Sequence, residues 1–307
     1  MPEGRRAFAG TDQTVGSLVH DVAGRLGAPE GSVREAREIV AALLDVPKHW
    51  PILHENRWLD VAVWRRARAA AARRAAGAPL AYAVGRANFR NLTLDVDERV
   101  LIPRPETELL VDLVLKRCTG GGTVVDVGTG SGAIAIALAT EGRFDRVIVT
   151  DISRDALDVA RANADRIGAR VEFLVGDLLS GCLVIGDGLW GPPITHQPSP
   201  ITAIVSNPPY ITFDEAEQLP SSVRDWEPAV ALFSPRDGLA VTARLVRQAA
   251  TQLAPGGLLA LEVDARRASL VAELVASDER YEHVNVHLDL AGRERFVLAT
   301  RRDEERR

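Results

Sequence analysis

The hydrophobic pattern divides the chain into a helical first part and a second part in which strands and helices alternate. From about residue 14 to residue 76, apolar residues recur at intervals of three and four, and no strand-like run occurs. A further helix is predicted for residues 61–76, with Trp64 on one side and arginines on the others. The residues at helical spacing before it are Val15, Leu18, Val19, Val22, Leu26, Ala36, Ile39, Val40, Leu43 and Leu44. The first part is therefore predicted to be a small helical domain.

From residue 123 onward, short apolar runs alternate with helical segments, which is the pattern of a doubly wound, mostly parallel sheet. Two final runs are separated by a short polar turn and are predicted to form a hairpin on one edge of that sheet. The seven predicted strands are 123–127, 147–150, 171–175, 203–206, 258–263, 281–290 and 295–300. We therefore predict an α/β fold with a seven-stranded, Rossmann-like sheet.

The residues between the two parts have a pattern of their own. Residues 89–96 alternate like a hairpin strand, and the two prolines of residues 101–105 make that segment stiff and extended. A helix over 109–115 leads into the sheet, and residues 180–200, rich in Gly and Pro, are predicted to be a surface insertion. The predicted division is 1–78 for a helical substrate-recognition domain, 79–104 for a β-hairpin linker and 105–307 for the α/β domain.

Composition excludes several classes of protein. The 307 residues contain 37 basic and 42 acidic side chains, a net charge of −5, so the surface is not the basic one that duplex DNA attracts. The two cysteines, Cys118 and Cys182, form neither a disulfide framework nor a metal site. No apolar run resembles a signal peptide or reaches the length of a membrane span. We therefore expect a cytoplasmic protein with no metal, no membrane segment and no stable nucleic-acid partner.

A glycine-rich turn follows the first strand of the sheet. Gly128, Gly130 and Gly132 allow the backbone to turn sharply and a ligand to approach closely. Gly128, Gly130 and Ala133 also satisfy the dinucleotide pattern, so an NAD-dependent dehydrogenase stays open at this point. Asp126 precedes the turn by two residues, where it can meet a ligand ammonium group. Together with the three glycines it gives the pattern Asp-x-Gly-x-Gly-x-Gly, which is typical of S-adenosylmethionine sites.

Acidic residues also end the next two strands of the sheet. Asp151 lies about 20 residues past the glycines, where a ribose diol is held, and Asp177 can accept from an adenine amino group. Each has a simpler interpretation, because Asp151 can cap the following helix and Asp177 can close a turn. Ligands of such sheets bind outside the carboxyl ends of the strands, where these acids lie in order. We take the cofactor as S-adenosylmethionine.

Asn207-Pro208-Pro209-Tyr210 follows the fourth strand and is the candidate for the reaction chemistry. The two prolines make a stiff turn, so the Asn207 side-chain oxygen and the Pro208 carbonyl can both face one pocket as acceptors. Two acceptors hold an –NH2 group with its lone pair free, and Tyr210 offers a flat surface for it. Alone, the four residues are equally typical of an ordinary turn.

With these motifs in order, the chain resembles the release-factor glutamine methyltransferases over about residues 75–300. Within that range the runs at 101–108 and 227–232 are more specific than Asn-Pro-Pro-Tyr alone. The runs that carry the resemblance are Gly77-Ala78-Pro79-Leu80-Ala81-Tyr82, Leu101-Ile102-Pro103-Arg104-Pro105-Glu106-Thr107-Glu108, the glycine turn, Ser206-Asn207-Pro208-Pro209-Tyr210-Ile211, Glu227-Pro228-Ala229-Val230-Ala231-Leu232 and Asp237-Gly238-Leu239.

The resemblance implies a protein that transfers methyl from S-adenosylmethionine to the glutamine of the Gly-Gly-Gln loop in class I peptide chain release factors, and we expect it to be a monomer. It implies that Asn207, Pro208 and Tyr210 act in catalysis and, with Pro209, hold the substrate amide. It assigns the cofactor to Asp126, Gly128, Thr129, Gly130, Ser131, Gly132, Asp151, Asp177, Leu178 and Asn207. One departure is at residues 262–267, where the family usually has Glu-Ile-Gly and then Gln, and this chain has Glu-Val-Asp-Ala-Arg-Arg.

Three alternatives stay open. An amino-group methyltransferase of DNA or rRNA bases uses the same logic on a flipped base, because adenine N6 and guanine N2 are also planar nitrogens. A paralogue can act on a glutamine of another protein. A binding module can keep the cofactor fold without catalysis, although the intact Asn207 and the intact glycines argue against it.

Overall fold

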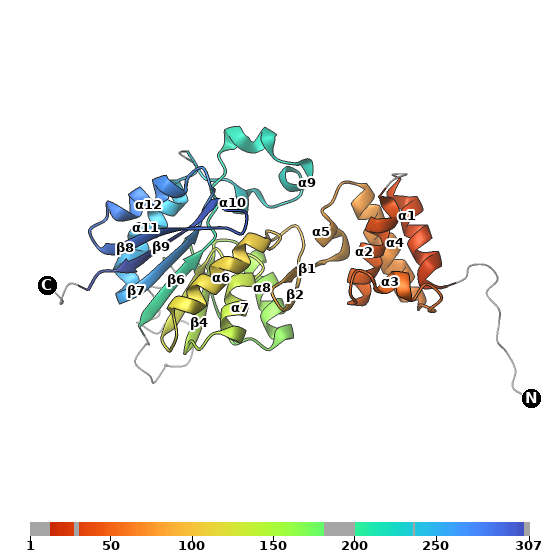
Figure 1. The fold of residues 1–307 in the computed structure, drawn as a ribbon, viewed down its shortest axis with the longest axis horizontal. Helices are drawn as coiled ribbons and strands as arrows, with labels where there is room; N and C mark the ends of the chain where they lie inside the picture. The colour runs from red at the N-terminus through yellow and green to blue at the C-terminus, as the bar shows by residue number, and fades with distance from the viewer. Residues whose placement is uncertain (1–12, 28–30, 181–199, 236, 304–307) are drawn as a thin grey trace, which may run out of the picture. The chain divides into compact units, whose positions relative to one another are not determined.

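The chain divides into two compact units, Met1–Arg86 and Ala87–Arg307, which are described separately (Figure 1). The computed structural model describes residues 13–27, 31–180, 200–235 and 237–303. Of the predicted insertion at 180–200, residues 181–199 lie outside the described residues. The division of the sequence at residues 78 and 104 into three functional parts stays a prediction.

The first unit is a bundle of amphipathic helices, as the spacing of its apolar residues predicts. Its helices are α1 (Val15–Leu26), α2 (Ser32–Leu44), α3 (Trp50–Leu53), α4 (Val61–Ala75) and α5 (Leu80–Val84). The side chains of Thr14 and Asp60 cap α1 and α4 by accepting from backbone N–H groups. Trp64 is buried on α4, and the guanidinium of Arg68 lies 5.2 Å from its ring centre. This unit therefore has a hydrophobic core of its own.

A two-stranded hairpin, β1 (Arg86–Phe89) and β2 (Leu92–Asp95), follows the helices. The predicted β-hairpin is therefore present in this linker, and its turn, at Arg90, lies near the start of the alternating run 89–96. Arg90 has a left-handed backbone with φ of 54°, and its N–H donates to the carboxylate of Glu108. Two polar residues separate Phe89 from Leu92, so the strict alternation holds only from Leu92 to Val96 and does not define the first strand.

A seven-stranded sheet forms the centre of the second unit, with strand order β5-β4-β3-β6-β7-β9-β8. The strands are β3 (Thr123–Val127), β4 (Arg146–Asp151), β5 (Glu172–Val175), β6 (Ile201–Ser206), β7 (Leu253–Glu262), β8 (Tyr281–Leu288) and β9 (Glu294–Arg301). The five strands from β5 to β7 are parallel, and β9 runs antiparallel to both of its neighbours. The predicted fold class and edge hairpin are confirmed. The largest difference is at the start of β7, which lies at Leu253 instead of residue 258, and the other strand bounds agree within two residues.

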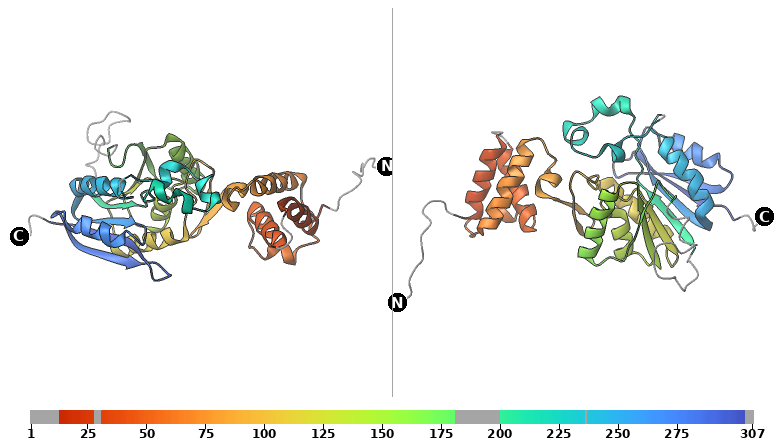
Figure 2. Two further views of the ribbon diagram at one scale, coloured as in Figure 1. Left: turned by 90° about the horizontal axis from the view of Figure 1, so that it is seen from above. Right: turned by 180° about the vertical axis from the view of Figure 1, so that it is seen from behind.

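Helices cover both faces of this sheet, and each face has its own core (Figure 2). The helices are α6 (Pro105–Arg117), α7 (Ala133–Glu141) and α8 (Arg154–Ile167) on one face, and α11 (Ala240–Gln252) and α12 (Ala268–Ala276) on the other. Successive side chains of a strand point to opposite faces, so Val124 belongs to the first core and Val125 to the second. Burial on both faces explains why the central strands are continuous apolar runs.

The segment between β6 and α11 folds back beside the end of β6. It contains η2 (Phe213–Gln218), α9 (Ser221–Arg224) and α10 (Ala229–Leu232). Its two ends meet at a short parallel bridge, in which Ile211 N–H donates to the Leu232 carbonyl and Ser234 N–H donates to the Ile211 carbonyl. The bridge makes residues 211–234 one closed excursion beginning directly after Asn207-Pro208-Pro209-Tyr210.

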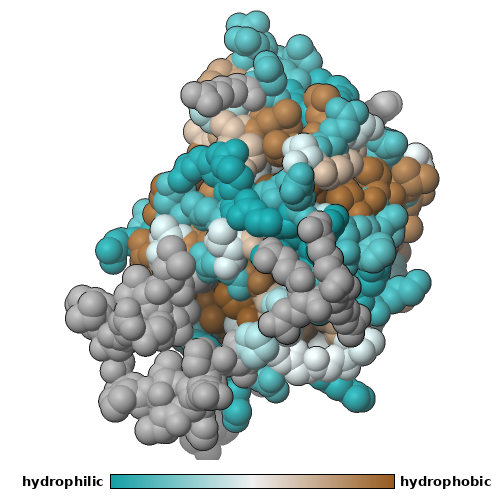
Figure 3. Space-filling view, turned by 90° about the vertical axis from the view of Figure 1, so that its left-hand side faces the viewer, coloured by the Kyte–Doolittle hydropathy of each residue, from teal (hydrophilic) through white to brown (hydrophobic). Residues whose placement is uncertain are grey.

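The surface mixes hydrophilic and hydrophobic side chains. On the face drawn in Figure 3, hydrophilic residues separate several hydrophobic patches. No helix within the described ranges combines the length and the apolar character that crossing a membrane requires.

Candidate active site

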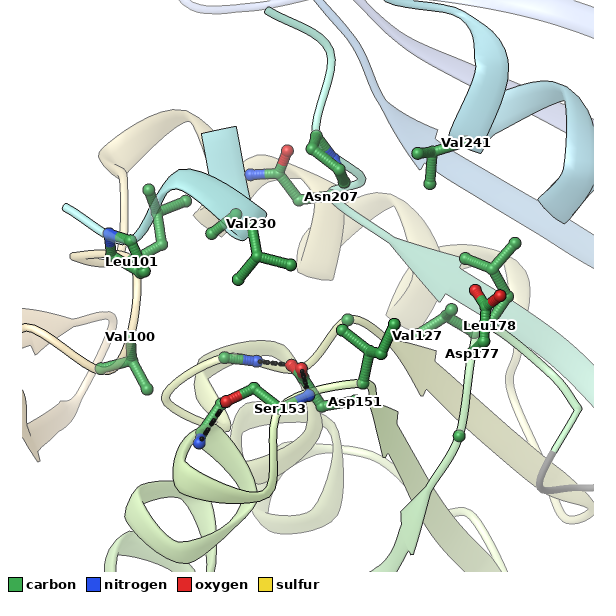
Figure 4. Close-up of a pocket in the computed structure, with 18 of the residues that line it drawn as sticks. Val100, Leu101, Val127, Asp151, Ser153, Asp177, Leu178, Asn207, Val230 and Val241 are labelled. Atoms are coloured by element: carbon green, nitrogen blue, oxygen red, sulfur yellow. Dashed lines mark hydrogen bonds between the residues drawn. The ribbon is translucent and has the colours of Figure 1, made fainter. Parts of the chain in front are cut away.

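A cavity of about 270 Å³ opens at the carboxyl ends of the parallel strands in the second unit (Figure 4). Its wall includes Gly128 and Gly130 of the glycine turn, Asp151 after β4, and Asp177 and Leu178 after β5. Asn207 and Pro209 close its other end. The strand order puts β3 between β4 and β6, and the predicted motifs therefore meet although the sequence separates them.

The glycine turn is held by backbone hydrogen bonds to the neighbouring strand. Gly128 N–H and Thr129 N–H donate to the Thr150 carbonyl, and Gly130 N–H donates to a carboxylate oxygen of Asp151 over 3.0 Å. Gly128 and Gly130 have φ of 72° and 54°, and a Cβ built on either would meet no atom within 4 Å. The turn therefore leaves open space at the cavity, where a ligand can lie against the backbone.

Gly132 has a different role from the two glycines before it. A Cβ at this position would lie 3.0 Å from Ile136 Cδ1 and 3.2 Å from Ala160 Cβ, so its glycine allows α7 and α8 to pack closely. Thr129 and Ser131 are buried and do not line the cavity. The predicted ligand contacts of Thr129, Ser131 and Gly132 stay predictions, because the structure places these residues behind the lining.

Asp126 is fully buried and also stands behind the turn. Its Oδ2 accepts from the Thr129 hydroxyl over 2.7 Å and from Ala135 N–H over 3.2 Å, while its Oδ1 has no partner. Burial raises the pKa of this carboxyl group to about 7. An unpartnered buried oxygen fits a cationic group supplied by a ligand, but Asp126 does not line the cavity, so that contact stays a prediction.

Asp151 connects the turn to the start of α8. Its two carboxylate oxygens accept from Gly130 N–H and from Ser153 N–H, over 3.0 and 2.9 Å. The helix cap itself is Ser153, whose hydroxyl accepts from Ala156 N–H. Burial raises the pKa of Asp151, and the backbone hydrogen bonds oppose that shift. Each oxygen keeps a second lone pair, which suits the hydroxyl groups of a ribose.

The third acid, Asp177, is half exposed and forms an ion pair with Arg244 of α11 at 2.5 Å. Leu178 beside it has a left-handed backbone with φ of 56° and lines the cavity. The sequence prediction omitted Arg244, and it also omitted most of the apolar wall. Among the apolar lining residues that it missed are Val100, Ile152, Val230, Phe233 and Val241. The run at 227–232 marked part of this wall without indicating where it lies.

At the acceptor end of the cavity, the Asn207 side chain is drawn opposite Asp151 (Figure 4). Pro209 lines the cavity, whereas Pro208 and Tyr210 are not among the lining residues. Burial raises the pKa of the Tyr210 hydroxyl to about 12, so the phenol is neutral at physiological pH. Gly238 lies against the Tyr210 backbone, and a Cβ there would come within 2.2 Å of the Tyr210 carbonyl oxygen.

Long-range side-chain contacts hold this end. Arg104 donates to both carboxylate oxygens of Glu227, over 2.8 and 2.7 Å, and so joins the two runs most specific to the resemblance. Glu227 is buried, which raises its pKa, and the charge of Arg104 opposes the shift. Thr107 donates to the buried Glu262 over 2.7 Å, and the Asn207 side-chain amide donates to Thr107 over 3.4 Å.

The departure at residues 262–267 contributes an arginine to the same end. Arg267 is largely buried, and it donates to the Asp237 carbonyl over 2.7 Å and to Glu215 of η2 over 2.9 Å. Arg266 and Asp264 form a further ion pair beside it. The departure therefore joins η2, which lies within the closed excursion, to the Asp237-Gly238 turn, which follows it.

Comparison with known proteins adds to this geometry. The sequence matches the family described as "Methyltransferase domain" over residues 124–184 and the one described as "PrmC N-terminal domain" over residues 18–85. The release factor glutamine methyltransferase of Gloeobacter violaceus is 42% identical over 248 residues, covering 80% of this chain and 80% of that protein. The protein of the same name from Deinococcus radiodurans is 38% identical over 90% of this chain and 94% of its own length. A Pyrococcus furiosus methyltransferase structure covers 68% of this chain and 88% of its own, with TM-score 0.48 and 18% identity.

Proposed function

This chain belongs to the release factor glutamine methyltransferase family, and on that premise we propose that it methylates the glutamine side-chain amide in the Gly-Gly-Gln loop of a class I peptide chain release factor. It is an S-adenosylmethionine-dependent protein-glutamine methyltransferase. The observation that carries the proposal is one cavity with the glycine turn and Asp151 at one end and Asn207 at the other.

The residues present fit the cofactor. Gly128 and Gly130 leave open space that would receive its chain, Asp151 would accept from its ribose, and Asp177 and Leu178 would border its adenine. The unpartnered oxygen of Asp126 suits its ammonium group. When bound, S-adenosylmethionine supplies an electrophilic methyl group on a positively charged sulfur.

The acceptor end has to position a weak nucleophile. An amide nitrogen shares its lone pair with its carbonyl group, so the site gains most by holding that nitrogen in line with the methyl group. The side-chain oxygen of Asn207, which lines the cavity, accepts from one N–H bond of the substrate amide. We assign the second acceptor to the Pro208 carbonyl and the flat support to Tyr210, which directly follow the lining residues Asn207 and Pro209 in the chain. With S-adenosylmethionine bound, a carbon–nitrogen bond would form as the carbon–sulfur bond breaks, S-adenosylhomocysteine would be the leaving group, and the nitrogen would lose one proton to solvent. The product is N5-methylglutamine.

The apolar wall suits a peptide loop better than a nucleic acid. Val230 lines the cavity and is 54% exposed, and Phe213 stacks on the lining residue Phe233 while remaining 66% exposed. Exposed apolar side chains at a cavity mouth favour contact with another protein. Family membership disfavours the DNA or rRNA alternative and a glutamine of an unrelated protein.

We propose the finer features on the same basis. The protein works as a monomer in the cytoplasm, where release factors act, and it has no stable nucleic-acid partner. Residues 1–78 recognise the release factor, 79–104 form the linker and 105–307 carry out methyl transfer. The match of residues 18–85 to the family's amino-terminal domain supports the assignment of residues 1–78 to recognition of the release factor.

One experiment tests the proposed function. The protein is incubated with methyl-labelled S-adenosylmethionine and one of four acceptors: a release factor, the same factor with its Gly-Gly-Gln glutamine changed to alanine, duplex DNA, or rRNA. We expect label on the unmodified factor only, located by mass spectrometry on that glutamine. Label on either nucleic acid, or equal label on both factors, would refute the proposal.

A further inference from the structure

Thr107 connects the acceptor asparagine to a buried carboxylate that the reaction itself does not use. Its hydroxyl lies 2.7 Å from a carboxylate oxygen of Glu262 and 3.4 Å from Nδ2 of Asn207. Thr107 is 5% exposed and Glu262 is 1% exposed, so water does not compete strongly for either group. Neither residue lines the cavity, and both therefore act on its contents only through a residue that does.

The fold brings these three residues together from different elements. Asn207 follows the last residue of β6, and Glu262 is the last residue of β7, the adjacent parallel strand. The pairing of Ser206 with Leu261 sets Asn207 and Glu262 side by side at the carboxyl ends of β6 and β7. Thr107 belongs to the first turn of α6, which begins at Pro105 and packs on the face near β7. The arrangement thus follows from strand register and one helix start.

The chemistry of a hydroxyl group fixes the direction of this chain of hydrogen bonds. Thr107 has one proton to donate, and an ionised Glu262 can only accept, so the proton is committed to Glu262. The Thr107 oxygen is then an acceptor toward Asn207, which has to present its NH2 group. If the Asn207 side-chain amide were rotated by 180°, its oxygen would face the Thr107 oxygen, and neither atom could donate to the other. The hydrogen-bond partners of the Asn207 side chain therefore determine which of its two terminal atoms is the nitrogen and which is the oxygen.

We propose that Thr107 is a positioning residue that holds the Asn207 side-chain oxygen toward the acceptor, with Glu262 fixing the direction of the Thr107 hydroxyl. The inference rests on the proposed function and names the source of its selectivity. An oxygen facing the acceptor favours the N–H groups of glutamine and disfavours the carboxylate of glutamate. A flipped Asn207 would offer N–H groups and reverse that preference. Thr107 and Glu262 thus make the site select an amide.

The test compares Thr107→Val, which keeps the volume and removes the hydroxyl, with Thr107→Ser, which keeps the hydroxyl. Thr140→Val is the matched control, because Thr140 donates to the Ile136 carbonyl within α7 and does not line the cavity. Three quantities are measured for each variant: kcat and KM with the release factor, the S-adenosylmethionine dissociation constant, and inhibition by a factor whose Gly-Gly-Gln glutamine is changed to glutamate.

Thr107→Val is expected to lower kcat about tenfold, the effect of one hydrogen bond to a reacting group, with cofactor affinity unchanged. It should also strengthen inhibition by the glutamate factor relative to the wild-type protein, an effect that a purely structural role would not produce. Thr107→Ser should restore most of kcat, and Glu262→Gln should fall between, because a glutamine can both donate to Thr107 and accept from it. Thr140→Val should match the wild-type protein.

Equal activity of Thr107→Val and the wild-type protein would overturn the inference, as would a serine variant no better than the valine variant. If Thr107→Val does not fold, Thr107→Ala takes its place, because alanine also lacks the hydroxyl: unchanged inhibition by the glutamate factor overturns the proposal and stronger inhibition supports it. The proposed function fails separately, through a wild-type protein that leaves the release-factor glutamine unmodified.

Discussion

The two ends of the cavity both lie at the carboxyl ends of the parallel strands, but different kinds of contact hold the residues at each end in place. At the cofactor end, the glycine turn and Asp151 are 21 residues apart and are joined through backbone N–H groups. At the acceptor end, the contacts join side chains 100, 123 and 155 residues apart, in the pairs Asn207 with Thr107, Arg104 with Glu227, and Thr107 with Glu262. A local backbone motif tolerates changes elsewhere in the chain, whereas a network of distant side chains depends on every member.

Loss of Asn207 is expected to give the largest effect. Asn207→Ala removes an acceptor that orients the nucleophile, and kcat should fall about 10²–10³-fold. Cofactor affinity should stay nearly unchanged, because the glycine turn and Asp151 are intact. Single-turnover kinetics and calorimetry measure the two quantities. Asn285→Ala on β8 is the control, since Asn285 is exposed and bonds only to the His283 carbonyl among the described contacts. Loss of cofactor binding by a folded Asn207→Ala protein would contradict the separation of the two ends.

The Arg104–Glu227 pair should show the next largest effect, and it should appear in stability. Arg104→Met leaves the Glu227 carboxylate buried without its partner, at a cost of about 3 kcal/mol in the free energy of unfolding. Urea denaturation measures this change. Arg224→Met, which breaks an exposed pair with Asp225, should leave the transition unchanged. A second substitution, Glu227→Gln, should recover part of the loss, and its failure to do so would show that the pair is not the cause.

A change at the cofactor end should alter binding and leave the chemical step intact. Asp151→Asn sets an amide NH2 against one of two backbone N–H groups and removes an acceptor for the ribose. We expect the S-adenosylmethionine dissociation constant to rise about tenfold, with kcat at saturating cofactor preserved. Asp155→Asn, at an exposed position in the first turn of α8, is the control. A fall in kcat without a change in affinity would reverse the roles assigned to the two ends.

The smallest expected effect is a dependence of kcat on pH, which arises at the acceptor end of the cavity. Burial raises the pKa of Glu262 to about 7, opposed by the Thr107 hydrogen bond and by Arg295 and Arg104, while Glu106 adds to it. Above that pH the carboxylate only accepts. Below it, the protonated group can donate to Thr107, and the Asn207 orientation is no longer fixed. We expect kcat to fall about threefold as pH decreases through the pKa. Glu262→Gln should lack this change.

Cofactor affinity should have its own dependence on pH. Asp126, also raised to a pKa of about 7 by burial, loses its charge as the pH falls, and its unpartnered oxygen then attracts an ammonium group less. Calorimetric titrations at several pH values should therefore show weaker S-adenosylmethionine binding on the acidic side in both the wild-type protein and Glu262→Gln. If the Glu262→Gln variant lost this dependence as well, Asp126 would not be its source.

Much of the fold could be predicted from local sequence. The strands β3, β4 and β6 are apolar runs because both of their faces are buried, so their bounds were predicted within two residues. The start of β7 was missed, because Pro255-Gly256-Gly257 carries the signals of a loop and yet continues the strand. The turn at Arg90 lies inside the run that alternates like a strand, and its only sequence signal is the break in alternation between Phe89 and Leu92.

The site was predictable only where its contacts are local. Spacing placed the glycines and Asp151 at the ends of two successive strands, but it did not show which face of β3 carries Asp126. Strand alternation sets Asp126 on the same face as Val124, under α7, and away from the cavity lining. The partnership of Thr107 with Glu262 spans 155 residues, and no pattern in either segment indicates it. Such contacts follow from the order of the strands, which the sequence does not state.

The close contact of Gly238 with the Tyr210 carbonyl has a practical consequence for protein engineering. The acceptor end of the cavity cannot be transferred as four residues alone, because it depends on residues outside Asn207-Pro208-Pro209-Tyr210. Grafting Asn207-Pro208-Pro209-Tyr210 onto another scaffold would leave Tyr210 without the bare backbone that fits against it, and without the bridge between Ile211 and Phe233 that closes the excursion. The smallest transferable piece extends to Gly238, and the recipient must also supply counterparts of Arg104 and Thr107.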